Sequence, residues 1–200
     1  MATEIKVPVV AAKGGSFLIE ERTPEEIFTP EDFTEEQVMI GQTADDFMLK
    51  ELVPRLPDLL KLDYELSRGL LRKAGELGLL GVEIPEEYGG LGLDKVSGCL
   101  VAEKAGRDGS FATTFAVQVG IGTLPIVYFG TEAQKKKYLP KLASGEWVSS
   151  YSLSEASSAS DAMNAKARAV LSPDGKSWIL NGEKMWLTNG GSSTLVAVLV

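Results

Sequence analysis

The chain reads YSLSEASSASD at residues 151–161 and NGEKMWLTNG at residues 181–190. Six of the ten residues from 151 to 160 carry a hydroxyl, which both donates and accepts hydrogen bonds. The indole of Trp186 offers a flat apolar face, and Thr188 points to the same side if this segment is a strand. The pattern favours a planar heteroaromatic cofactor with a phosphate- or sugar-rich tail. A serine-rich surface loop and an ordinary Asn-Gly hairpin turn remain the alternatives.

Helical signals dominate the chain before residue 147. Two capping-box pairs predict helix starts, namely Thr34 with Gln37 and Thr131 with Gln134. Pro54 and Pro57 are expected to break the first helix because proline lacks a backbone N–H. Further helices are expected to begin at Ser67, Asp94 and Ser110. The predicted apolar faces contain Val38, Met39, Phe47, Leu52, Leu70, Leu71, Ala74, Leu77, Val96, Leu100 and Val101.

Strand and turn signals take over near Trp147. The expected strands are 147–153, 165–171, 178–180, 185–188 and a buried strand at 194–200. A turn at 172–175 joins the second of these strands to the third. An all-helical unit is therefore followed by the opening of an antiparallel β unit. Because a sheet that ended in the apolar run 195–200 would expose an unpaired edge, we expect this sequence to be the N-terminal portion of a longer protein.

The chain is thus expected to have a multidomain α+β organisation in three parts: an extended leader at 1–33, an all-α domain at 34–146 and the start of a β domain at 147–200. The leader contains several prolines and a Gly14-Gly15 pair. Its apolar residues could pin it to a folded body as a strap: Phe17, Leu18, Ile19 and Phe28.

Composition excludes several classes of function. The net charge of −8 argues against binding to nucleic acid or to an anionic membrane surface. The absence of histidine removes the commonest metal ligand, and no metal site is expected. The single cysteine, Cys99, allows no internal disulfide, suits the cytoplasm and is interpreted as a small buried hydrophobe. No apolar stretch is expected to be long enough to span a bilayer.

The two opening stretches resemble the flavin-binding signature of the acyl-CoA dehydrogenase family. The matching residues are Tyr151-x-Leu153-Ser154-Glu155, then Ser160-Asp161, then Leu180-Asn181-Gly182-x-Lys184-x-Trp186-Leu187-Thr188-Asn189. Residues 84–92 and 129–146 resemble further family segments, so the resemblance runs from about residue 35 to the end. Three positions depart from the family pattern: Ser154 replaces Thr, Ala156 replaces Pro and Ala159 replaces Gly. The leader from Gly14 to Leu18 and the Ser157-Ser158 pair most resemble the very-long-chain branch.

The resemblance implies bound FAD and a set of residues around it. Tyr151, Leu153 and Ser154 would line the edge of the flavin ring. Trp186 would pack on the isoalloxazine with Leu187 beside it, and Thr188 would hydrogen-bond near flavin N5. Ser160 would contact both the cofactor and the CoA portion of the substrate. The family also implies a barrel-like middle β domain and a C-terminal helical bundle beyond this chain.

The implied reaction is α,β-desaturation of long or very-long-chain acyl-CoA in fatty acid β-oxidation. A carboxylate takes the α proton while flavin N5 accepts the β hydrogen as hydride. No catalytic residue of this chain matches, and the base is expected beyond Val200. Glu103 and Asp108 are interpreted as solvated or capping residues, whereas Glu155 either shapes its loop or is merely exposed.

The resemblance also implies partners and leaves alternatives. An acyl-CoA substrate, an electron-transfer flavoprotein and a homo-oligomer are expected, in the cytoplasm, with peripheral membrane association left open for parts outside this chain. An acyl-CoA oxidase is the second enzyme reading, because it shares much of the signature but passes electrons to oxygen. A non-catalytic assembly or scaffold protein on the same fold is the third reading, and the changes at residues 154 and 156 leave room for it.

Overall fold

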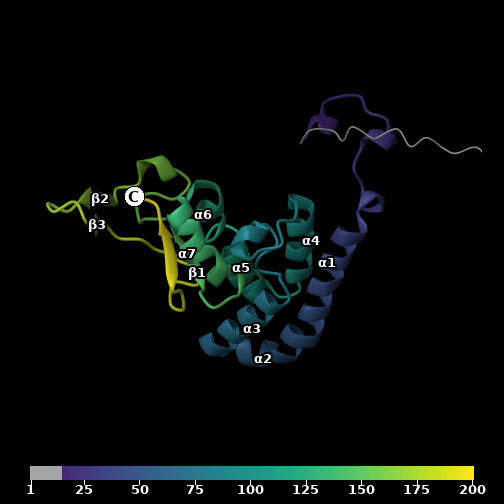
Figure 1. The fold of residues 1–200 in the computed structure, drawn as a ribbon, viewed down its shortest axis with the longest axis horizontal. Helices are drawn as coiled ribbons and strands as arrows, with labels where there is room; N and C mark the ends of the chain where they lie inside the picture. The colour runs from purple at the N-terminus through teal and green to yellow at the C-terminus, as the bar shows by residue number, and fades with distance from the viewer. Residues whose placement is uncertain (1–14) are drawn as a thin grey trace, which may run out of the picture. The chain divides into compact units, whose positions relative to one another are not determined.

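The computed structural model describes residues 15–200, which fall into two compact units divided between Val38 and Met39 (Figure 1). Residues 1–14, with Gly14 of the very-long-chain resemblance, lie outside the described residues. Where the sequence predicts an extended leader, the first unit contains three short 3₁₀ turns, Ser16–Leu18, Pro24–Glu26 and Pro30–Asp32. The four apolar residues expected to act as a strap are exposed: Phe17, Leu18, Ile19 and Phe28.

The helix α1, Glu35–Phe47, begins at the predicted capping box. The Thr34 N–H donates to Gln37 Oε1 at 3.0 Å, and the Gln37 N–H donates to Thr34 Oγ1 at 3.2 Å. The helical path continues through a π-helical turn, Met48–Leu52, a 3₁₀ turn, Val53–Arg55, and the short helix α2, Leu56–Leu59. The two prolines therefore change the helix type, because each lies in the first turn of a helical piece, where its missing N–H costs little.

Aspartate N-caps begin three of the following helices. Asp63, Asp94 and Asp108 accept the backbone N–H of the residue three positions on, at 2.9, 2.8 and 2.7 Å. The helices of this part are α3 Tyr64–Glu76, α4 Lys95–Ala105, α5 Gly109–Val119, α6 Leu124–Phe129 and α7 Glu132–Ala143. The predicted start of α3 at Ser67 is too late, because Asp63 is its cap.

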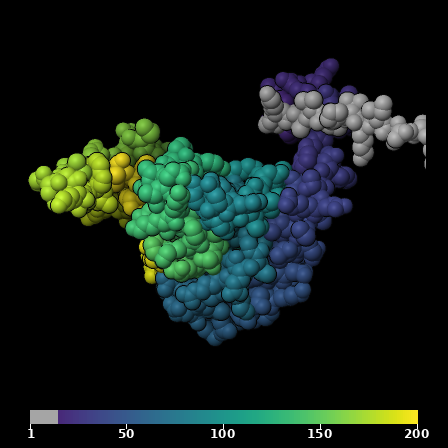
Figure 2. Space-filling model, in the orientation of Figure 1, coloured from purple at the N-terminus to yellow at the C-terminus, as the bar shows by residue number. Residues whose placement is uncertain are grey.

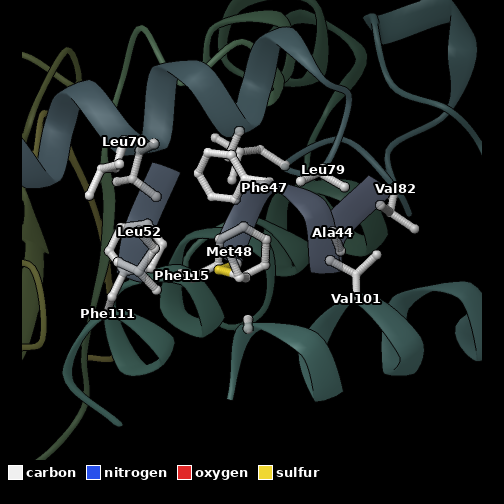
Figure 3. Close-up of a cluster of buried hydrophobic side chains, with 14 of the residues drawn as sticks. Ala44, Phe47, Met48, Leu52, Leu70, Leu79, Val82, Val101, Phe111 and Phe115 are labelled. Atoms are coloured by element: carbon white, nitrogen blue, oxygen red, sulfur yellow. The ribbon is translucent and has the colours of Figure 1, made fainter. Parts of the chain in front are cut away.

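The main apolar core lies among α1, α3, α4 and α5. Figure 3 shows Phe47 and Met48 between Leu70 on one side and Phe115 and Val101 on the other. The buried residues of α1 and the following turn recur at helical spacing: Ile40, Ala44, Phe47, Met48 and Leu52. The predicted core residues Val38 and Met39 on α1, and Leu77 just after α3, are exposed instead.

Two expectations about single stretches of these helices were wrong. Cys99 is exposed, because Ser97, Leu100 and Val101 form the buried face of α4. The stretch Gly109–Phe129 is long and apolar enough, by length and composition, to cross a membrane, although the sequence suggests no such stretch. It is divided into α5 and α6 near Gly120, and its buried phenylalanines and Gln118 make α5 a core helix of this unit.

The motif at residues 84–92 packs against α7. Ile84 and Tyr88 are buried with Leu139 and Leu142 in a second apolar cluster. The Tyr88 hydroxyl donates to Glu132 Oε2 at 2.8 Å, and this carboxylate raises the pKa of Tyr88 to about 12. A Cβ at Gly90 would lie 1.9 Å from the Ile84 carbonyl oxygen, so only glycine fits this close approach.

Four short strands follow the helices: β1 Ser149–Ser152, β2 Arg168–Leu171, β3 Trp178–Asn181 and β4 Leu195–Val198. The predicted hairpin is present, because β2 and β3 pair in antiparallel register with Val170 opposite Ile179. The pairing of β1 with β4 is parallel, however, with Ser149 opposite Leu195. The expectation of an antiparallel unit is therefore wrong for this pair. A parallel pair needs a long connection, and here the connection contains the whole hairpin.

The hairpin projects from the rest of its unit (Figures 1 and 2). None of its eight strand residues is buried. The strand predicted at 185–188 is not formed, because Trp186 has a left-handed backbone with φ +61°. The expectation of a buried strand at 194–200 was wrong: half-buried and exposed positions alternate along β4, and none of its four residues is buried.

Candidate flavin site

A cavity of about 230 Å³ lies between the end of α5, the end of β1 and the segment after the hairpin. Its lining residues are Val117, Ile121, Tyr151, Leu153, Ser154, Met185, Trp186 and Thr188. Five of the residues predicted to contact a cofactor therefore come together: Tyr151, Leu153, Ser154, Trp186 and Thr188. Apolar and aromatic groups form much of the wall, and three hydroxyls lie among them. Such a wall suits a flat ring with polar atoms at its edge.

A buried glutamine in α5 fixes the start of β1, the strand that leads to the cavity. Gln118 Oε1 accepts the Ser149 N–H at 2.7 Å, which fixes the first residue of β1 against α5. The Gln118 side-chain amide donates to the carbonyls of Leu142 at 3.1 Å and Trp147 at 3.0 Å. Gly122 allows this close packing, because a Cβ there would lie 2.3 Å from Ser149 Oγ. The helical domain thereby sets the position of β1.

The segment that carries Trp186 is attached to β1 and to the residues that follow it, both before and after the tryptophan. Before Trp186, the Met185 N–H donates to the Ser154 carbonyl at 2.9 Å. After it, the Ser150 hydroxyl donates to the Thr188 carbonyl at 2.7 Å. The Asn189 amide donates to the carbonyls of Thr114 at 3.0 Å and Ser149 at 3.1 Å. These bonds, and not a strand alternation, bring Trp186 and Thr188 to one cavity.

Leu187 faces away from this cavity. It lines a second one, of about 180 Å³, together with Asn189 and residues of α3 and α5. Arg68 in that lining donates to the Ser192 carbonyl at 2.7 Å. The segment 186–189 therefore separates two cavities, with Trp186 and Thr188 on one side and Leu187 and Asn189 on the other.

Glu155 shapes its loop, which resolves the alternative that the sequence leaves open. Its side chain is buried and accepts the backbone N–H groups of Lys166 at 2.7 Å and Ala167 at 2.9 Å. Lys184 Nζ donates to Glu155 Oε1 at 2.8 Å and to the Leu153 carbonyl at 3.0 Å. The Lys184 hydrogen bond, followed by the two backbone N–H groups, lowers the pKa of Glu155 to about 2.

The remaining predicted residues lie elsewhere. Ser160 is exposed in the loop after Glu155 and does not line the cavity. Glu103 is exposed and pairs with Lys104, and Asp108 caps α5, as the sequence suggests. Carboxylates and lysines are absent from the lining of the cavity, so its walls supply no strong acid or base. Within residues 15–200, no group of three or more metal-ligating side chains comes together.

Sequence reasoning missed the residues that hold the cavity together. Lys184 and Asn189 stand inside the quoted motif, but their partners lie far away in sequence, at Glu155 and at Thr114 and Ser149. Gln118 gives no local signal beyond being a lone amide in an apolar helix. That isolation is the one usable hint, because a buried amide needs several partners.

Comparison with known proteins agrees with this arrangement. The family model of the acyl-CoA dehydrogenase N-terminal domain matches residues 34–146. A probable acyl-CoA dehydrogenase of Bacillus subtilis is 52% identical over 186 residues, covering 93% of this chain and 31% of that protein. The human mitochondrial very long-chain specific acyl-CoA dehydrogenase is 45% identical over 124 residues, covering 62% of this chain and 19% of that protein.

A solved structure is also similar. The crystal structure of an acyl-CoA dehydrogenase complexed with FAD from Bacillus anthracis matches with a TM-score of 0.89 and 53% identity, covering 94% of this chain and 32% of that one. The chain thus spans about a third of the length of these two bacterial relatives. Because the family model matches more than half of the chain, the chain belongs to the acyl-CoA dehydrogenase family.

Proposed function

We propose that this chain contributes the first part of an FAD-dependent acyl-CoA dehydrogenase, which desaturates an acyl-CoA thioester between its α and β carbons. The observation that carries the proposal is the cavity where Tyr151, Leu153 and Ser154 meet Trp186 and Thr188. The residues fit a flavin, because an indole and aliphatic groups can cover the ring while hydroxyls meet its polar edge. FAD, when bound there, supplies the acceptor for the β hydride.

The role of the chain's own residues is to bind and orient. Trp186 and Thr188 line the cavity, so the indole would pack on the flavin ring and the Thr188 hydroxyl would hydrogen-bond near flavin N5. Val117 and Ile121, from α5 and the following turn, add apolar groups to the lining. The base that takes the α proton is assigned to a part of the protein outside these 200 residues, because the cavity lining contains no carboxylate.

The finer parts of the proposal rest on the family resemblance. They comprise a preference for long or very-long acyl chains, CoA and cofactor contacts by Ser160, a flavin contact by Leu187, and electron transfer to an electron-transfer flavoprotein. The proposal also includes a homo-oligomer and a cytoplasmic location. It places the start of the helical domain at residue 34 and a barrel-like middle domain after it, from residue 147. The lone cysteine supports the location, because it permits no internal disulfide.

Cofactor binding gives the first test. The natural full-length protein should purify yellow or take up added FAD. Trp186→Ala should weaken FAD binding, because a stacked aromatic contact is worth about 0.5–1.5 kcal/mol beyond area burial. Trp178→Ala is the matched control, since this second tryptophan lies in the exposed hairpin. A colourless folded protein that rejects FAD, or equal FAD dissociation constants for the two variants, would contradict the proposal.

Turnover gives the second test. The full-length protein should reduce a chemical electron acceptor with palmitoyl-CoA, faster than with butyryl-CoA if the long-chain preference is right. Residues 1–200 alone should not turn over either substrate, because no base is available at the cavity. Turnover by the fragment would show that the base has been misplaced, and Glu103, Asp108 and Glu155 would be the first residues to substitute.

A further inference from the structure

The contacts of the Trp186 side chain do not by themselves fix its position at the cavity. The residue is 83% exposed, and its backbone has the left-handed conformation that a tryptophan rarely adopts, with φ +61°. Neither burial of the indole nor strand pairing therefore fixes the ring. Its position depends on the attachment of the residues before and after it.

On the side after Trp186, the attachment consists of neutral hydrogen bonds from Ser150 and Asn189. On the side before it, the attachment includes a buried ion pair. The side chains of Lys184 and Glu155 are only 10% and 6% exposed, and Nζ lies 2.8 Å from Oε1. Lys184 Nζ also holds the Leu153 carbonyl at 3.0 Å, beside the Ser154 carbonyl that receives the Met185 N–H. The ammonium thus binds the two cavity walls to each other.

Glu155 is held in turn by the chain that leads into the hairpin. Its Oε2 accepts the Lys166 N–H and its Oε1 accepts the Ala167 N–H. Both carboxylate oxygens are therefore used, and a glutamine could not accept all of these bonds, because its amide nitrogen is a donor. A neutral side chain at this position would remove the charge that holds the Lys184 ammonium.

We propose that the Glu155–Lys184 pair is a positioning device for the flavin site: it clamps the segment before Trp186 to residues 153–155, which follow β1, and so sets where the indole meets the ring. The inference rests on the proposed function, because it assumes that a flavin occupies this cavity. The pair touches no reacting atom. Its effect passes through Met185 to Trp186 on one wall and through Leu153 to Ser154 on the other.

The experiment uses the natural full-length protein loaded with FAD. The variants are Glu155→Gln, Lys184→Met, the double variant, and the conservative Lys184→Arg and Glu155→Asp. Glu183→Gln is the matched control, because it makes the same change at an exposed carboxylate next to Lys184. The measurements are the FAD dissociation constant, the visible absorption spectrum of the bound flavin, kcat and KM at saturating FAD, and thermal stability.

We expect Glu155→Gln and Lys184→Met to raise the FAD dissociation constant about tenfold, comparable to the loss of an outer-shell partner of a metal ligand. The flavin bands should shift and kcat should fall more than KM changes. The double variant should be no worse than either single one, because the two residues act as one unit. Lys184→Arg and Glu155→Asp, which keep the charges, should recover part of the loss and remain informative if a neutral variant does not fold. Glu183→Gln should match the wild type.

Two outcomes separate the proposals. If the wild-type protein takes up no FAD, the proposed function itself fails. If the wild type binds FAD, but the variants show wild-type spectra and kcat at saturating FAD with only a lower melting temperature, the pair is merely structural and this inference is overturned.

Discussion

The helical part of the larger unit and the part after residue 147 are stabilised by different forces. The helices bury a continuous set of aliphatic and aromatic side chains (Figure 3). After residue 147, the buried apolar residues are Val148 and Ala167 alone, whereas five polar residues are buried: Ser149, Ser150, Ser152, Glu155 and Ser158. The first part is therefore stabilised by removing apolar surface from water, and the second by satisfied polar contacts.

The difference explains how the cavity is built. The hydrophobic effect is non-directional, whereas hydrogen bonds fix distances and directions. The helices give β1 a rigid base through Gln118, and the polar contacts then fix the segment from Lys184 to Asn189 at defined distances. Substitutions should consequently destabilise the two parts in different ways. In the helices they should leave cavities, and in the polar part they should leave buried groups without hydrogen-bond partners.

The largest expected effect is a truncation in the helical core. Phe115 is 1% exposed in the middle of the main cluster. Phe115→Ala should lower the free energy of unfolding by about 3–5 kcal/mol, because it removes buried apolar surface and leaves a cavity. Urea unfolding followed by circular dichroism measures the change. Phe129→Ala is the control, since Phe129 is 86% exposed, and it should change the unfolding free energy by less than about 0.5 kcal/mol.

The second-largest effect should come from removing the buried side-chain amide of Gln118. Gln118→Ala leaves the Ser149 N–H and the Leu142 and Trp147 carbonyls without this buried partner. The unfolding free energy should fall by about 1–3 kcal/mol, the usual cost of an unsatisfied buried group. Gln42→Ala is the comparison, because Gln42 is exposed and its side chain bonds only to Asp46, one turn away. Equal losses for the two variants would contradict the distinction drawn between the two parts.

The helices are the part that the sequence predicts well. Their starts are encoded locally, by Thr34 and Thr131 in capping boxes and by Asp94, and a side chain that caps a helix lies within three residues of its partner. Which face is buried is less local. Cys99 and Met39 were assigned to the core because they are apolar, yet the twist of each helix places them on the outer face.

The strands and the cavity depend more on long-range contacts than on local sequence signals. The hairpin follows from its turn, but the parallel pairing of β1 with β4 depends on where distant chain returns. The motif residues at the cavity follow from the family resemblance, which brings Tyr151 and Trp186 together. The left-handed Trp186 and the attachments by Lys184 and Asn189 could not be predicted, because their partners are dozens of residues away and no local pattern encodes them.

Acid should affect the polar part before it affects apolar packing. The pKa of Glu155 is lowered to about 2 from its ordinary value of 4.5. Its contribution to stability is therefore present above the ordinary pKa and is lost as the pH falls toward the folded value. The melting temperature of the wild type should drop between about pH 5 and pH 2 more steeply than that of Glu155→Gln. Glu183→Gln should follow the wild-type curve of melting temperature against pH. Parallel curves for the wild type and Glu155→Gln would contradict the stabilising role assigned to the Glu155 carboxylate.

The smallest expected effect is in the β2–β3 hairpin, which has neither buried apolar packing nor buried polar contacts. Ile179 is 48% exposed and its cross-strand neighbour Val170 is 58% exposed, so neither packing nor a buried polar contact stabilises this pair. In the 200-residue chain, Ile179→Ser should change the unfolding free energy by less than about 1 kcal/mol, the range of a single cross-strand pair. The same substitution in the natural full-length protein tells whether further chain covers this face, because a covered isoleucine costs several times more to replace. A large loss already in the 200-residue chain would mean that the hairpin packs against the helices, and the contrast between the two parts would then be wrong.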